Sequence, residues 1–99
     1  MSNNNHINNN QIKAQLEEIA PYVPVVDRVH GGNHPEFHDV RRVFNSLLEK
    51  TQAEDSPDLN SEFEELRKIT NNFAVPEDVC ETFEGIYQTL EAVDQLYNA

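Results

Sequence analysis

Four stretches of the chain carry apolar side chains at steps of three and four residues, and this spacing limits the folds open to it. Such steps place all the apolar side chains of a stretch on one face of an α-helix. The four faces are Ile12, Leu16, Ile19, Val23, Val26 and His30; Phe37, Val40, Phe44, Leu47 and Thr51; Leu59, Phe63, Leu66, Ile69 and Phe73; and Val79, Phe83, Ile86, Leu90, Val93 and Tyr97. No stretch alternates with the period of two that marks a β-strand, so we predict an all-α fold.

Three short polar connections, near residues 31–34, 53–57 and 70–76, join these stretches. Short connections force consecutive helices to pack antiparallel. We therefore predict an up-down-up-down antiparallel four-helix bundle that forms one domain over residues 9–99. Residues 1–8 are rich in asparagine and are predicted to be a disordered tail.

Prolines and serines mark the expected helix starts and one distortion. Pro21 and Pro24 lie inside the first stretch, where a proline removes a backbone hydrogen bond. The apolar face keeps its phase across both prolines, so we predict that the first helix is bent there rather than divided. Ser56, or Ser61 as part of a capping box, is the expected start of the third helix. Pro76 is expected in the first turn of the fourth.

The turn before the second helix contains two glycines. We expect Gly31-Gly32 to end the first helix in the left-handed conformation of a C-terminal cap. Asn33 or His34 is the expected N-cap of the second helix, with Pro35 at its first position. Gly85, which lies off the last apolar face, is predicted to mark the close approach of a neighbouring element.

Acidic residues greatly outnumber basic ones, with 18 Asp and Glu against 7 Lys and Arg and a formal charge of −11. Such a surface repels nucleic acid and anionic membranes, and no apolar run approaches the ~18 residues needed to span a bilayer. The N-terminus lacks the basic and apolar regions of a signal peptide. The single cysteine, Cys80, cannot form an internal disulfide, which is typical of the cytoplasm. We expect neither a nucleic-acid partner nor a membrane partner.

Two segments resemble a known family. Residues 29–36, Val-His-Gly-Gly-Asn-His-Pro-Glu, and residues 66–80, Leu-Arg-Lys-Ile-Thr-Asn-Asn-Phe-Ala-Val-Pro-Glu-Asp-Val-Cys, resemble segments of the hemerythrin-like iron–sulfur cluster repair proteins. The resemblance covers residues 6–97 and implies a hemerythrin-like bundle. In such a bundle the two segments share one end, and the di-iron site lies at the other.

The resemblance does not extend to the iron ligands. Gln11 and Ile12 stand where the family has a double histidine, and residues 49–54 contain no His-x-x-x-Glu. We expect a shortened member without a cofactor, lacking the family's ligand-bearing end and its N-terminal cysteine-bearing domain. The shortened end is predicted to expose apolar surface for a protein partner or for self-association. The residues of this candidate interface are Ile12, Thr51, Leu59 and Tyr97.

A second candidate site is the opposite end, with His30, His34, His38 and Cys80. Zinc or iron accepts such donors, so the alternative function is a metal-binding or redox protein. A plainer interpretation makes His34 a cap, His30 the end of the core, His38 an exposed side chain and Cys80 a small buried one. A Cys80–His30 nucleophile pair is disfavoured by nearby acids and by a helix start at Pro76. No catalytic residue is predicted, and the favoured function is a non-enzymatic helical module that acts through protein interaction.

Overall fold

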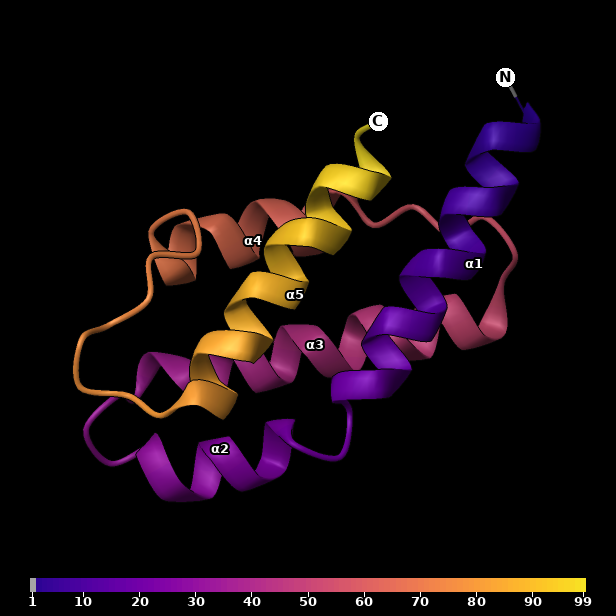
Figure 1. Ribbon diagram of the computed structural model, residues 1–99. Helices are drawn as coiled ribbons and strands as arrows, with labels where there is room; N and C mark the ends of the chain where they lie inside the picture. Colours follow the sequence, from indigo (N-terminus) through magenta and orange to yellow (C-terminus); the bar gives the residue numbers. More distant parts are fainter. Residues whose placement is uncertain (1) are drawn as a thin grey trace.

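Five helices make up the regular structure of the described residues. The computed structural model describes the backbone of residues 2–99 and the side chains of residues 9–99. Over that backbone the helices are α1 (Ser2–Ile19), α2 (Val23–His30), α3 (Glu36–Ala53), α4 (Asn60–Thr70) and α5 (Glu81–Tyr97), with no strand (Figure 1). The all-α prediction is confirmed. The tail predicted for residues 1–8 lies outside the residues whose side chains are described.

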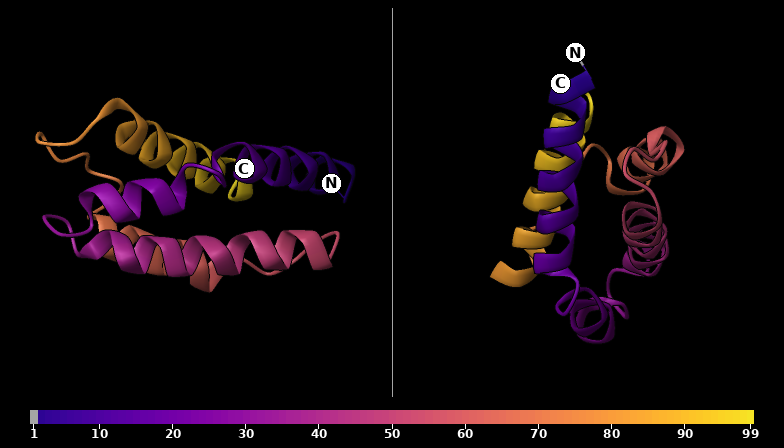
Figure 2. Two further views of the ribbon diagram at one scale, coloured as in Figure 1. Left: turned by 90° about the horizontal axis from the view of Figure 1, so that it is seen from below. Right: turned by 90° about the vertical axis from the view of Figure 1, so that its right-hand side faces the viewer.

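The helices form two layers. In one, α1 and α5 lie side by side and run in opposite directions, and in the other α3 and α4 do the same (Figure 2). The short helix α2 closes one end between the layers. The predicted apolar faces supply the core, in which Ile12, Leu16, Phe44 and Leu90 are almost fully buried.

The first predicted helix is divided rather than bent. α1 ends at Ile19 and α2 begins at Val23, after a tight turn in which the Tyr22 N–H donates to the Ile19 carbonyl at 2.9 Å. Pro24 falls in the first turn of α2, where its missing N–H costs no intrahelical hydrogen bond. The apolar face nevertheless keeps its phase, because Ile19 and Val23 are both buried.

Polar contacts mark both ends of α4. Its start at Asn60 differs from both predicted serine starts, because Asp58 Oδ1 accepts the Asn60 N–H at 3.0 Å. The helix ends at Thr70, and Asn71 follows as a left-handed cap with φ 53°. Asn72 and Phe73 are also left-handed, and the Phe73 N–H donates to Thr70 Oγ1 at 2.8 Å.

α5 begins at Glu81, five residues after the predicted position of Pro76. Residues 71–80 form a non-helical connection instead, and Cys80 is extended, with φ −80° and ψ 169°. Pro76 followed by acids is compatible with a helix start, but Asp78 is engaged by His34 across the chain. Cys80 therefore occupies the N-cap position of α5.

Buried carboxylates join successive helices. Asp94 accepts two hydrogen bonds from Arg67, at 2.8 and 2.9 Å, and links α5 to α4. Glu62 lies 2.8 Å from Lys50 Nζ and links α4 to α3. Burial by itself raises the pKa of Glu62, but the hydrogen bonds from Lys50 and two serines outweigh it, so this pKa falls below its usual value.

Candidate functional site

The α2–α3 turn and the α4–α5 connection meet at one end of the molecule. His30 Nε2 lies 3.3 Å from Cys80 Sγ, and His34 Nε2 lies 2.8 Å from Asp78 Oδ1. These contacts confirm the prediction that the histidine turn and the segment before Cys80 share an end. They also bring together side chains that are more than 40 residues apart in sequence.

His34 joins the two connections through both ring nitrogens. Its Nδ1 lies 3.0 Å from Glu36 Oε2, while its Nε2 contacts Asp78. Burial on its own lowers the pKa of His34, but the hydrogen bonds to Asp78 and Glu36 outweigh it, so the pKa is raised. The hydrogen bond from His34 lowers the pKa of Asp78 despite partial desolvation. His34 therefore lies between two carboxylates. It is not the predicted helix cap, because α3 shows no side-chain hydrogen bond at its N-cap.

Cys80 is exposed, which corrects the prediction of a small buried side chain. It precedes the first turn of α5, where the helix dipole favours negative charge, so the positional argument against a Cys80–His30 pair is also wrong. His30 is held edge-on against Phe83, with ring centroids 5.5 Å apart. The contact brings a thiol and an imidazole within proton-transfer distance in a place open to solvent.

His38 belongs to a separate group. Its Nδ1 contacts Asp27 Oδ1, and Arg41 Nη1 donates to Asp27 Oδ2 at 3.1 Å, which ties α3 to α2. The His38 contact lacks hydrogen-bond geometry, so Asp27 Oδ1 is buried without a hydrogen bond. Gly31 lies against this group, because a Cβ there would stand 2.3 Å from the Asp27 carbonyl oxygen and 2.7 Å from His38 Cε1. Gly31 is right-handed, with φ −60°, so close approach and not the predicted left-handed cap requires glycine.

The side chains described at this end do not form a ligand set for a metal ion. Among the side chains of residues 9–99, no three His, Cys, Asp or Glu groups come together in a way that could hold an ion. His34 and His38 each contact carboxylates of their own, apart from the His30–Cys80 pair. At the end where the family resemblance implies iron, Ile12 belongs to the core. The metal alternative for His30, His34, His38 and Cys80 therefore lacks a ligand set.

The predicted apolar interface is not exposed. Ile12 and Leu59 are 0% exposed and Thr51 is 7% exposed. Tyr97 covers this end, since its ring packs on Phe63 and its hydroxyl accepts the Leu59 N–H at 3.0 Å. The predicted exposure is wrong because the end of α5 and the start of α4 close over this end of the core.

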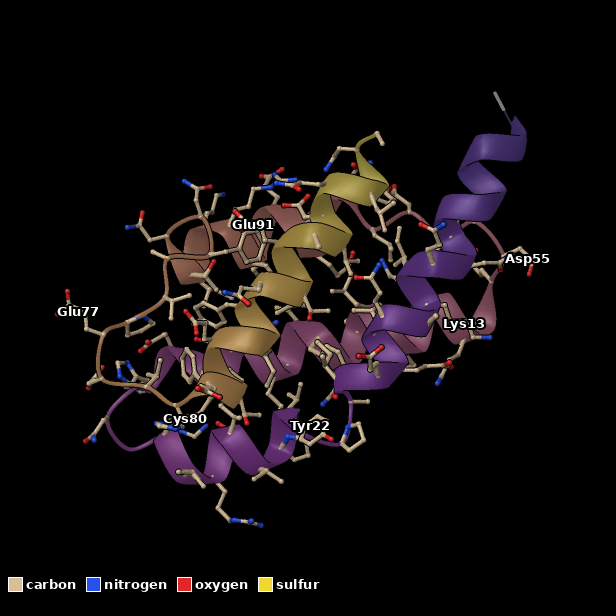
Figure 3. All side chains as sticks on the ribbon, viewed as in Figure 1. Lys13, Tyr22, Asp55, Glu77, Cys80 and Glu91 are labelled. Carbon is tan, nitrogen blue, oxygen red and sulfur yellow. The ribbon has the colours of Figure 1, made fainter. Side chains whose placement is uncertain are left out.

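An apolar row that was not predicted from the sequence lies along the outward face of α2 and its N-cap residue. Tyr22, Val25 and Val29 are 53%, 42% and 65% exposed. Their spacing of three and four residues predicts that they share one helix face. This second face is easily overlooked, because the buried face of the same helix also carries apolar residues at that spacing. Figure 3 shows Tyr22 at the start of α2 and Cys80 beside its end, so the row leads toward the cysteine.

A shallow groove of about 350 Å³ adjoins this row. Its lining comes from α1, α5 and the turn between α1 and α2, and consists of Glu18, Ile19, Tyr22, Thr82, Gly85, Ile86 and Thr89. No atom lies within 4 Å of the position that a Cβ on Gly85 would occupy. The predicted close approach at Gly85 is therefore wrong, and the glycine leaves open space.

Comparisons with known proteins do not assign the chain. No protein-family model matches it, and no solved structure matches it. None of the helices in the described part of the chain has the length and apolar character to cross a membrane.

Proposed function

We propose that this chain is a non-enzymatic helical module that acts by binding another protein or a second copy of itself. We also propose that it is related to the hemerythrin-like iron–sulfur cluster repair proteins and shares their four-helix plan. Two observations support the relationship: the antiparallel pairing of α1 with α5 and of α3 with α4, and the meeting of the two family-like segments at one end.

The outward face of α2 carries the proposal of protein binding. Val23 and Val26 already attach α2 to the core, so Tyr22, Val25 and Val29 are not needed for packing within the chain. Isolated exposed apolar residues are common, but a row of three along one short helix and its N-cap forms a continuous surface. Burying such a surface against a partner would stabilise the complex by about 25 cal/mol for each Å² of apolar area removed from water.

Site-specific photocrosslinking tests this function. A benzoylphenylalanine at Val29 is expected to give one discrete adduct in cells, whose mass distinguishes a partner from a second copy. The matched control places the same group at Asn45, which is exposed on α3. The proposal fails if Val29 gives no adduct, or if both positions give the same set of adducts.

A thiol function is a second candidate, favoured by the 3.3 Å contact between His30 Nε2 and Cys80 Sγ. In this reaction His30 takes the thiol proton, and the thiolate attacks one sulfur of glutathione disulfide. A mixed disulfide forms on Cys80, and a glutathione thiolate leaves and is protonated by solvent or His30. Mass spectrometry is expected to show slower adduct formation in a His30→Gln variant than in wild type. Equal rates of adduct formation in the two proteins would show that His30 does not assist the reaction of Cys80.

A further inference from the structure

We infer that the partner presents a basic amphipathic helix, which lies in the groove between the α1–α2 corner and α5 with its apolar side against Tyr22, Val25 and Val29. This inference rests on the proposed protein-binding function and names the chemistry of the partner.

The shape of the groove suits a helix. On α5, Thr82, Gly85 and Thr89 follow one another at steps of three and four residues and line the groove, so they form a narrow face of small side chains. Helices approach to 8–10 Å where small residues meet. The open space above Gly85 allows that approach. The half-exposed ring of Tyr22 also lines the groove.

The apolar contacts of the groove continue onto α2. Ile19 and Ile86 contribute to the lining of the groove, and Tyr22 belongs both to the groove and to the exposed row. A helix with apolar residues at every third or fourth position would therefore contact the groove and the row together. A partner with a flat polar surface would leave the side chains of Val25 and Val29 exposed to water.

The charge of the chain selects a basic partner. Glu18 lines the groove, and Glu81 is exposed on α5 one turn before Gly85. Five of the seven lysine and arginine side chains already contact a carboxylate of the same chain: Arg41, Arg42, Lys50, Arg67 and Lys68. The remaining acidic excess is open to solvent. Arg28 on α2 adds one exposed positive charge beside the row.

A second copy is a poorer occupant than a basic helix. Each copy carries a formal charge of −11, so a dimer through this face would bring two acidic surfaces together. Lysines or arginines on the polar side of a partner helix would instead face Glu18 and Glu81. Such pairs on the rim accelerate association and select the partner, while the apolar contacts hold the complex.

Two synthetic peptides of equal length and identical leucine pattern test the inference. One carries lysine and the other glutamate at the polar helix positions, and both are labelled for fluorescence anisotropy with the full-length chain. We expect the lysine peptide to bind and the glutamate peptide not to bind. Val25→Ser combined with Val29→Ser is expected to weaken binding by at least about tenfold, without changing the net charge. Gly85→Leu, which fills the groove, is expected to weaken it similarly.

Each contrary result has a distinct meaning. If the lysine peptide binds wild type and the double valine variant equally, its binding is diffuse charge attraction and the inference is overturned. If the glutamate peptide binds as well as the lysine peptide, the surface binds an apolar helix without charge selection, which overturns the basic partner but leaves protein binding intact. If neither binds wild type, the inference fails, and photocrosslinking at Val29 still decides the proposed function separately. Circular dichroism verifies that the variants keep the helical content of wild type.

Discussion

Replacing Gly31 by alanine is expected to destabilise the protein by about 2 to 4 kcal/mol. The new Cβ would stand 2.3 Å from the Asp27 carbonyl oxygen and 2.7 Å from His38 Cε1. The His38 side chain is 60% exposed and can turn away, but the carbonyl oxygen belongs to the backbone of α2. Overpacking of this kind costs about 1–3 kcal/mol. The shift also breaks the 2.8 Å hydrogen bond from the Gly31 N–H to that carbonyl, which adds about 0.5–1.5 kcal/mol.

Gly32 provides the matched control. Nothing lies within 4 Å of its Cβ position, and its φ is not left-handed. Gly32→Ala is therefore expected to be neutral or to stabilise by about 0.4–1 kcal/mol, because alanine restricts the unfolded chain. The pair separates the effect of close approach from the general effect of adding a methyl group to this turn.

Urea denaturation followed by circular dichroism measures both variants. With an m-value of about 1–1.5 kcal/mol/M, Gly31→Ala is expected to lower the urea midpoint by more than about 1 M. Combining it with His38→Ala is expected to restore only part of the loss, because the contact with the Asp27 carbonyl remains. A midpoint for Gly31→Ala within error of wild type, or an equal loss in Gly32→Ala, would refute the reasoning.

Three further variants test other contacts. The pKa of His34 is raised in the folded state, so its stabilising contribution is complete below the ordinary value of 6.5 and is lost as pH rises through the higher folded pKa. In urea titrations, the stability difference between wild type and His34→Gln should therefore be largest below pH 6.5 and shrink as the pH rises above that value, and a constant difference would contradict this. Gly85→Ala should stabilise by about 0.5–1 kcal/mol in the same assay, because helical alanine replaces glycine in open space, and destabilisation would show a close neighbour. Arg67→Met should destabilise by about 1.5–3 kcal/mol, since it leaves buried Asp94 without two hydrogen bonds, and an unchanged midpoint would make the pair dispensable.

The helices and most of the core could be predicted because they depend on local spacing. The period of three and four residues identified side chains such as Leu16, Phe44 and Leu90, which the structure buries. The left-handed end of α4 at Asn71 was also predictable, because asparagine tolerates that conformation. In each case the determining interaction lies within one turn of the residue.

The predictions that failed depend on contacts between distant parts of the chain. Pro76 followed by acids is compatible with a helix start, but Asp78 pairs with His34 and residues 77–78 form a turn instead of a helix. The position of Cys80 at the start of α5 follows from this pairing, and with it the contact to His30. Likewise, the closure of the end around Leu59 depends on Tyr97, which is 38 residues away. Single-residue patterns contain no information about such partners.

The break after Ile19 connects these local and distant effects with the proposed function. A continuous bent helix would keep the residues of α2 in the α1 layer, whereas the break allows α2 to close the end between the layers (Figure 2). An end-closing helix of eight residues contacts the core on one side only, through Val23 and Val26. Its other side faces solvent, so Val25 and Val29 form an exposed row. The break after Ile19 thereby leaves an exposed apolar row on α2, which is where we propose that a protein partner binds.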